Sequence, residues 1–301
     1  MQQALHYIGT LLICATLLGL ASTASYTSDP EAYLEIEALY TNEGLLQGYQ
    51  AYVKTPVCET DNCYIVEINF TWDLIGRFQK YDTIVGAGLT KLDHIPFTEG
   101  DYQKLDQLLK DSKSPLANYK KEELVRDTRS STIDGFTGAT VLEVKESVIS
   151  GGVYSCYTLW HLAHGPVVDS LQRRTYLQLD TALVEKIVDQ SDQEMNYFLM
   201  QYFSEQNYLQ YLPQILKTFE SGSGYYAKQA IEQMPKSVFA TPLAQDFFAE
   251  QFGQLNYFTQ VALLKKLQSE TLSKAMIQTL QTHLEERNSA KDVLIRALLE
   301  I

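Results

Sequence analysis

Basic residues are scarce in this sequence: 24 Lys and Arg stand against 37 Asp and Glu, and the formal net charge is −13. Nucleic-acid phosphates are bound by clustered lysine and arginine, so an acidic chain without a basic stripe is a poor nucleic-acid binder. The motifs Gly-x-Ser-x-Gly and His-Glu-x-x-His and the Walker phosphate-binding loop are also missing. These absences argue against nucleic-acid binding and against the common hydrolase classes.

Cysteine is equally rare, with four residues in the chain. Cys58 and Cys63 flank a short polar stretch, and we expect them to form a disulfide that closes a hairpin. Metal binding by this pair is less favoured, because no second pair of ligands is in sight. Cys156 is then left over, and we expect it to be a buried free thiol.

A long hydrophobic run occurs only at the N-terminus, where residues 4–24 carry no Asp, Glu, Lys or Arg. Ser22-Thr23-Ala24 supplies the small residues that a signal peptidase needs, so the sequence predicts a signal peptide over residues 1–24. The run is nearly long enough to span a membrane, and an uncleaved anchor is the alternative. Export would expose Cys58 and Cys63 to oxidising conditions, which favours their disulfide.

The chain as a whole has the composition of a globular protein, with 45% hydrophobic and 20% charged residues among 301. This length is sufficient for two domains. Strand-like patterns in the first half give way to successive helical patterns from about residue 178. We therefore predict an α+β domain over residues 25–177 and an all-α domain over residues 178–301.

The first domain opens with a predicted meander. Residues 49–57 and 63–72 are the best strands, because apolar and polar side chains alternate in the second and turn residues separate the two. Residues 74–81 are predicted as a third strand of the same sheet. Residues 31–46, which precede them, are predicted as a helix.

Two helices are predicted after the meander. Thr98 and Asp101 form a capping box that opens the first, and the second covers residues 153–164. One side of the second helix carries rings: Tyr154, Tyr157, Trp160, His161 and His164. Such a wall can stack on a flat cofactor, although rings at helical spacing also belong to ordinary cores. The histidines lack a carboxylate pattern that would complete a metal site, so none is predicted.

The second domain is predicted to contain helices over residues 181–190, 192–204, 208–220, 224–234, 242–252, 257–269, 272–287 and 290–301. Short turns join them, so neighbours should pack antiparallel. The triplets Asn196-Tyr197-Phe198, Gly224-Tyr225-Tyr226 and Asn256-Tyr257-Phe258 recur in the first halves of helices. The spacing is typical of helical-hairpin arrays, and the pattern resembles HEAT-like repeats; an irregular bundle is the alternative.

The stretch Asp134-Gly135-Phe136-Thr137-Gly138-Ala139-Thr140 precedes a pattern of valines at helical spacing. Thr137 and Thr140 are therefore expected at or just before a helix N-terminus, where unpaired N–H groups and the helix dipole favour an anion. Gly138 and Ala139 have almost no side chain, so a phosphorylated ligand can approach the backbone. An ordinary turn capped by Thr137 is the alternative.

This stretch resembles the flavinylation motif of FMN-binding domains, as found in the sodium-pumping NADH:quinone reductase and in the related Rnf complex. The family pattern is Asp, two residues, Ser or Thr, Gly, Ala, then Thr or Ser, and a flavin transferase links FMN through its phosphate to the final hydroxyl. The resemblance implies that Asp134, Thr137, Gly138, Ala139 and Thr140 occupy the motif positions. It also implies that FMN is held as a phosphoester on Thr140.

Two functions follow as hypotheses. In the first, the chain is an exported, periplasmic flavoprotein that is loaded by a flavin transferase, carries FMN on Thr140 and transfers electrons in the bacterial cell envelope. Trp160 or His161 would then contact the flavin ring, and the helical array would dock a redox partner. In the second, the chain keeps the fold without flavin and is a scaffold that binds another envelope protein.

Overall fold

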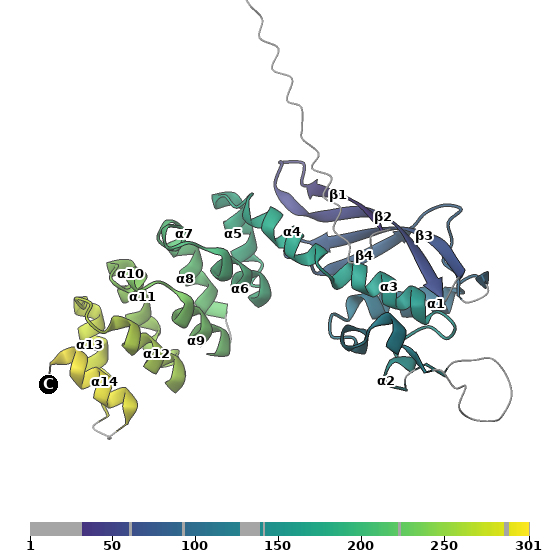
Figure 1. The fold of residues 1–301 in the computed structure, drawn as a ribbon. Helices are drawn as coiled ribbons and strands as arrows, with labels where there is room; N and C mark the ends of the chain where they lie inside the picture. The colour runs from purple at the N-terminus through teal and green to yellow at the C-terminus, as the bar shows by residue number, and fades with distance from the viewer. Residues whose placement is uncertain are drawn as a thin grey trace, which may run out of the picture.

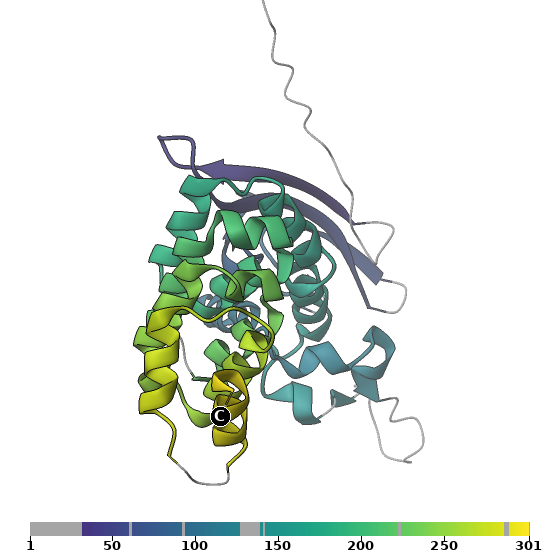
Figure 2. The same ribbon diagram turned by 90° about the vertical axis from the view of Figure 1, so that its left-hand side faces the viewer.

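The computed structural model describes residues 32–59, 62–91, 94–126, 139–140, 142–221, 224–285 and 289–300. A four-stranded antiparallel sheet and a series of helices make up this part of the chain, which confirms the predicted α+β class (Figure 1). The helices that follow the sheet lead away from it, so the C-terminus lies at the far end of the molecule from the strands (Figures 1 and 2). No helix within the described ranges is both long and apolar enough to cross a bilayer.

The sheet is a meander in which strands adjacent in sequence are also adjacent in space. Its strands are β1 (Tyr33–Tyr40), β2 (Leu46–Glu59), β3 (Asn62–Asp73) and β4 (Phe78–Thr83). The strands predicted over residues 49–57 and 63–72 are confirmed. The third predicted strand is present too, but it begins at Phe78, because the residues just before it make the turn that follows β3.

The helix predicted over residues 31–46 is wrong, because this segment contains strand β1. Its Glu and Ala content favours a helix locally, but Leu34 is buried while Glu35 and Glu37 are exposed, which is the alternation of a strand. Leu34 pairs with Val53 in the β1–β2 ladder. Cross-strand pairing and burial therefore override the local helix preference.

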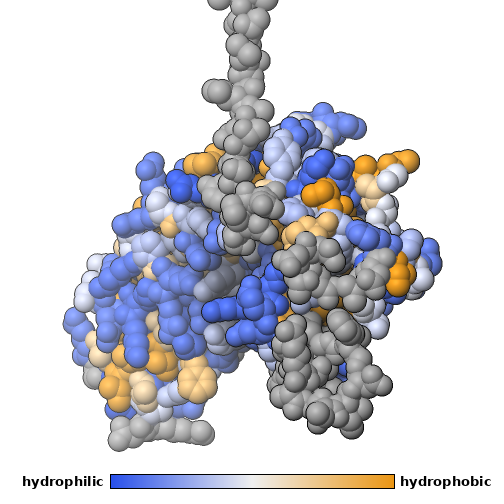
Figure 3. All heavy atoms as spheres, turned by 45° about the vertical axis from the view of Figure 1, so that its right-hand side comes forward, coloured by the Kyte–Doolittle hydropathy of each residue, from blue (hydrophilic) through white to orange (hydrophobic). Residues whose placement is uncertain are grey.

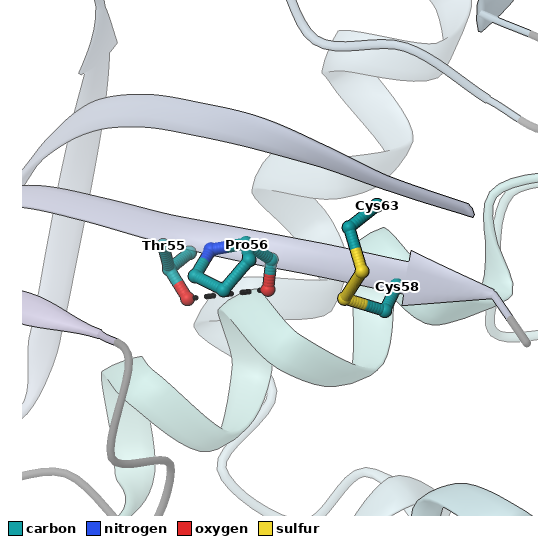
Figure 4. The surroundings of a disulfide bond; sticks show 4 residues. All are labelled: Thr55, Pro56, Cys58 and Cys63. Carbon is teal, nitrogen blue, oxygen red and sulfur yellow. Dashed lines mark hydrogen bonds between the residues drawn. A yellow bond between two sulfur atoms is a disulfide. The ribbon is translucent and has the colours of Figure 1, made fainter. Parts of the chain in front are cut away.

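The predicted disulfide joins Cys58 to Cys63, which are opposite residues of β2 and β3 beside the hairpin end (Figure 4). Their Cα atoms are 4.0 Å apart. On the same strand, Thr55 is buried, and its hydroxyl donates to the carbonyl oxygen of Pro56 at 3.5 Å. The bridge thus fixes the register of the longest strand pair at the end where no other strand adds support.

One face of the sheet is covered by α3 (Val153–His164) and α4 (Val167–Tyr176). The indole N–H of Trp72 on β3 donates to the carbonyl oxygen of Ala163 at 2.8 Å. The hydroxyls of Tyr49 on β2 and Thr175 on α4 lie 2.9 Å apart. The helix predicted over residues 153–164 is therefore confirmed, and it packs on the strands that carry the largest buried rings.

Helix α1 (Glu99–Lys110) begins at the predicted capping box. The N–H of Thr98 donates to the carboxylate of Asp101 at 2.8 Å, and the N–H of Asp101 donates to the hydroxyl of Thr98 at 3.3 Å. After α1 come short elements: η2 (Pro115–Asn118), η3 (Lys121–Glu123), β5 (Val125–Arg126), β6 (Ala139–Thr140) and α2 (Leu142–Lys145).

The rest of the described chain is helical, as predicted. Its elements are α5 (Thr181–Asp189), α6 (Gln193–Tyr202), α7 (Glu205–Gln210), α8 (Leu212–Ser221), α9 (Gly224–Gln233), α10 (Lys236–Phe239), α11 (Pro242–Gln251), η4 (Phe252–Gln254), α12 (Tyr257–Leu267), α13 (Lys274–Thr282) and α14 (Ala290–Leu299). The single helix predicted over residues 208–220 is wrong in detail, because α7 and α8 meet there as two helices. Helices α4 and α10 were not predicted.

These helices form two rows. Helices α5, α8, α11 and α13 contact one another in succession, and α6, α9, α12 and α14 do the same. Most begin at a side chain that accepts a backbone N–H: Asp180, Asp192, Ser204, Thr241, Asn256, Ser273 and Ser289. Such caps accept hydrogen bonds from backbone N–H groups that are unpaired at the start of a helix. Residues close in the sequence therefore determine where these helices begin. The face drawn in Figure 3 is mainly hydrophilic, with hydrophobic residues in small separate groups.

Polar contacts link the sheet to the helical rows. The ammonium group of Lys186 on α5 donates to the carbonyl oxygen of Leu46 at 2.9 Å, and the hydroxyl of Tyr40 donates to Gln178 at 2.9 Å. Arg77, beside β4, pairs with Asp192 at the start of α6 at 2.7 Å. The predicted boundary after residue 177 falls in the connection between α4 and α5, and these contacts cross it.

Candidate functional site

The predicted attachment motif lies only partly within the described residues. Asp134, Thr137 and Gly138 fall outside them, and Ala139 and Thr140 are the two residues of strand β6. Strand β6 pairs antiparallel with β5, so that the residues on either side of the segment 127–138 are neighbours. The motif therefore leaves from and returns to one point of the fold.

The helix expected directly after the motif is shorter than predicted. Helix α2 has one turn, and beyond it the N–H of Val148 still donates to the carbonyl oxygen of Val144. Val144, Val148 and Ile149 are buried, with at most 3% of their surface exposed. The valine pattern thus anchors the segment after Thr140 in the core, but a one-turn helix has only a small dipole, so the expected anion site at its start is weak.

Trp160 lies on α3 with 5% of its surface exposed. Its indole N–H donates to the carbonyl oxygen of Asp111 at 2.8 Å, and its ring centroid is 4.8 Å from that of His164. Burial lowers the pKa of His164, and its Nε2 lies 2.8 Å from the carbonyl oxygen of Leu109. Trp160 is therefore held in place by the end of α1, and its contact with a flavin stays a prediction.

Another ring pair of α3 lies beside η2 and η3. The rings of Tyr157 and His161 lie 4.1 Å apart, and both side chains are half-buried. Burial raises the pKa of Tyr157, and the nearby carboxylate of Glu122 on η3 raises it further. His161 Nε2 lies 3.2 Å from the carbonyl oxygen of Leu116 on η2, and burial lowers the pKa of this histidine. In the chain, η3 is followed by β5, the strand that pairs with β6.

A separate pocket of about 700 Å³ opens where the β3–β4 turn, α3 and α4 meet α6 and α9. Rings line much of it: Phe78, Trp160, Tyr197, Phe198, Tyr225 and Tyr226. The turn packs tightly at one wall, because Gly76 has a φ of +81° and a Cβ built there would lie 2.9 Å from Val168 Cγ1. The pocket is within the size range of small-molecule sites.

Charged groups at the pocket are paired with one another. Arg77 contacts Asp73 at 2.6 Å, Asp192 at 2.7 Å and Glu194 at 3.1 Å. Burial opposes its charge, but the hydrogen bonds that it donates to Asp192 and Asp73 outweigh this and raise its pKa. Lys110 contacts Asp106 at 2.7 Å. The cations of the pocket wall are thus neutralised by the protein itself.

This pocket was not predicted from the sequence, because its wall joins positions more than a hundred residues apart, such as Arg77 and Tyr225. One signal was present. The repeated triplets place Tyr197 and Tyr225 at similar points of α6 and α9, and these helices are neighbours in one row. Repetition indicated equivalent surface positions, but only the fold brings them opposite Trp160 and the β3–β4 turn.

Cys156 is a free, fully buried thiol, as predicted. Burial raises its pKa to about 12, and its sulfur accepts the N–H of Ile149 at 3.4 Å. It is therefore an inert core residue at neutral pH. Among the residues that the structure describes, no group of at least three His, Cys, Asp or Glu side chains is placed to hold a metal ion.

Comparisons with known proteins add no relative: no family model, no curated protein and no solved structure matches this chain. Function is therefore inferred from the residues and their geometry alone.

Proposed function

We propose that this chain is an exported flavoprotein that carries FMN covalently on Thr140 and transfers electrons at the bacterial cell envelope. The observation that carries the proposal is the sequence Asp134–Thr140, which resembles the flavinylation motif at each of its defined positions. The Thr140 hydroxyl would form the phosphoester. Asp134 would orient the turn, or the metal ion of the transferase, during attachment.

The described backbone around Thr140 supports this proposal. The pairing of β5 with β6 fixes the backbone at Thr140. The buried residues Leu124 and Val144 anchor the chain on either side of the ladder. The acceptor residue would therefore lie between two anchored points of the folded domain.

Two rings of α3 also suit a flavin. Tyr157 and His161 are half-buried beside η2 and η3, and η3 precedes β5 in the chain. Aromatic rings of this kind can stack against an isoalloxazine ring and shield it from water. FMN supplies the redox chemistry when bound, and these side chains would set its position and surroundings.

The test is co-expression with the chain's own flavin transferase. We expect wild-type protein to be yellow after denaturation, and to be heavier by one FMN less one water. Thr140→Ala should abolish the added mass and keep the circular dichroism spectrum, while Thr137→Ala should reduce attachment without abolishing it. The same intact-mass measurement on envelope fractions should give a mature N-terminus near Ser25.

A known substrate of the same transferase is the positive control. If that substrate gains flavin and this chain does not, covalent FMN is excluded. The scaffold function then becomes the conclusion, and the exposed rings of the helical rows favour it. Tyr225 and Phe258 are 74% and 68% exposed, and large aromatic side chains that face solvent to this extent are common at protein interaction surfaces.

A further inference from the structure

The pocket between the sheet and the helical rows is separate from the attachment residue Thr140, although Trp160, a predicted flavin contact, lines it. Its walls come from the β3–β4 turn, α3, α4, α6 and α9, whereas Thr140 belongs to the β5–β6 ladder beside α2. Figure 1 draws α2 apart from α6 and α9. What the pocket binds is therefore a separate question from whether Thr140 carries FMN.

Two tyrosines form ring platforms at the pocket's helical wall. The hydroxyl of Tyr197 on α6 accepts a hydrogen bond from the amide of Gln233 at 3.0 Å, and that of Tyr225 on α9 accepts one from Gln229 at 2.9 Å. Tyr225 is 74% exposed. These bonds orient the rings before any ligand arrives, so less conformational freedom is lost on binding.

Buried rings form the floor below these platforms. Phe78, Phe198, Tyr226 and Trp160 each have at most 7% of their surface exposed. The hydroxyl of Tyr226 donates to Thr218 at 3.0 Å, away from solvent. The floor is therefore apolar and flat-sided, and it suits a ligand that presents C–H faces.

Amides supply the polar part of the lining. Gln172 is fixed between the carbonyl oxygen of Ile75 at 3.0 Å and the hydroxyl of Tyr202 at 3.3 Å. Gln193 and Gln201 lie about two turns apart on α6, and both line the pocket. Each amide carries both a donor and an acceptor, which matches hydroxyl groups that also do both.

The charges of the pocket argue against an ionic ligand. Each nitrogen of the Arg77 guanidinium contacts a carboxylate, and Lys110 contacts Asp106. A phosphate or carboxylate ligand would have to displace these partners and face the acidic side chains left behind. Arg77 shares its single charge among Asp73, Asp192 and Glu194, so this wall is net acidic. A cation would have to compete with Arg77 for Glu194, a carboxylate of the lining, which Arg77 contacts at 3.1 Å.

We infer that this pocket binds a neutral, polyhydroxylated ligand, namely a short stretch of carbohydrate. Sugar rings stack their C–H faces on the tyrosine platforms and exchange hydroxyl hydrogen bonds with the glutamines. A sugar ring combines C–H faces that stack on aromatic rings with hydroxyl groups that both donate and accept, which matches this lining. The inference goes beyond the proposed electron transfer and does not depend on it.

The test uses the full chain and three neutral probes, maltotriose, cellotriose and chitotriose, in isothermal titration calorimetry. We expect at least one to bind with a Kd below about 1 mM. Trp160 lines the pocket and Trp72 lies in the core, so binding should also change the fluorescence of the wild type. The Thr140→Ala protein should bind equally well, which separates this test from that of the flavin.

Tyr225→Ala should weaken binding about tenfold or more, because it removes a stacking platform. Tyr257→Ala is the matched control: Tyr257 is also exposed and begins α12, the next helix of the same row, but it does not line the pocket. This control should leave affinity unchanged within about twofold. Gln201→Ala should weaken binding without altering the circular dichroism spectrum.

Three outcomes would overturn the inference. One is that none of the trisaccharides gives heat or a fluorescence change at about 5 mM. Another is that Tyr225→Ala and Tyr257→Ala weaken binding equally, which would place the sugar elsewhere. AMP and choline serve as charged probes, and binding of either one that Tyr225→Ala abolishes, with no sugar binding, would also reject the neutral-ligand assignment.

Discussion

The sheet region and the helical rows bury their hydrophobic residues through different kinds of contact. In the sheet region, contacts join residues far apart in sequence, as when Trp72 donates to Ala163 and Tyr49 meets Thr175. In the rows, each helix mainly contacts the next helix of its own row and the one before it. The first arrangement is cooperative over the whole region, whereas the second is a chain of local interfaces. A destabilising substitution should therefore affect the whole of the sheet region, whereas in the rows its effect should be limited to the neighbouring helices.

The largest expected effect comes from removing a buried ring in each region. Trp72 is 1% exposed, and Phe248 on α11 is fully buried against Phe219 and Phe239. Replacing either by alanine should lower the unfolding free energy by about 3–5 kcal/mol. Hydrogen exchange followed by mass spectrometry should then differ: Trp72→Ala should speed exchange in β2, β3, α3 and α4 together, whereas Phe248→Ala should speed it only in α11 and its neighbours α8, α10 and α13.

If Phe248→Ala speeds hydrogen exchange in the sheet as much as in the helical rows, the expected difference between the two regions is wrong. It would mean that the rows and the sheet unfold as one cooperative unit, and that a substitution in one row helix destabilises elements far beyond its neighbours.

An intermediate effect is expected where the two regions meet. Arg77→Gln leaves the carboxylates of Asp73, Asp192 and Glu194 facing one another without their shared cation. We expect a loss of roughly 1–2 kcal/mol in urea unfolding. We also expect faster exchange at the start of α6, which Asp192 caps through the N–H groups of Glu194 and Met195.

Lys228→Gln is the control for Arg77→Gln. Lys228 pairs with Glu232 at 2.8 Å within the single helix α9, so this ion pair joins no two parts of the fold. Its loss should change stability by less than about 0.5 kcal/mol. If both substitutions have the same small effect, the contacts of Arg77 do not hold the sheet to the rows.

The smallest effect concerns acid stability at the start of α1. Partial burial would raise the pKa of Asp101, but its bonds to Lys91 and to the backbone and hydroxyl of Thr98 bring it down to about 2. The folded pKa is below the unfolded value of about 3.9, so this stabilisation is complete above pH 4 and is lost as the pH falls toward 2. Thermal melts of Asp101→Asn should show a flatter decline over this interval than wild type.

If the two proteins lose stability with the same slope between pH 4 and 2, the Lys91–Asp101 contact does not contribute. The expected effect is confined to the sheet region, because Lys91 and Asp101 both precede the helical rows.

Local patterns predicted the elements whose boundaries depend on nearby residues. Alternation predicted β2 and β3, the spacing of Cys58 and Cys63 predicted the disulfide, and Thr98 with Asp101 predicted the start of α1. Strand β1 was missed, because its Glu and Ala residues favour a helix until β2 supplies a partner. Helix α4 was missed as well, although Val167 and Leu171 have helical spacing, because Gln172, Arg173 and Arg174 give it the pattern of a polar connection.

The candidate sites divide in the same way. The motif ending at Thr140 is visible in the sequence because its chemistry lies in consecutive residues. The pocket is not visible there, because Arg77, Trp160 and Tyr225 become neighbours only through packing. The pairing of Arg77 with three carboxylates is also hidden from the sequence, since the charge of Arg77 alone would suggest an anion site.

The sequence by itself determined where helices begin, because Asp180, Thr241, Asn256 and similar caps satisfy backbone donors within a few residues. It also contains the consecutive residues on which the proposed attachment at Thr140 rests. The tertiary structure alone decided that β1 is a strand, that Trp160 and His164 of α3 line the pocket, and that Arg77 is surrounded by carboxylates. Those features depend on contacts between residues that are distant in the sequence, and such contacts stabilise the protein only after the core has packed.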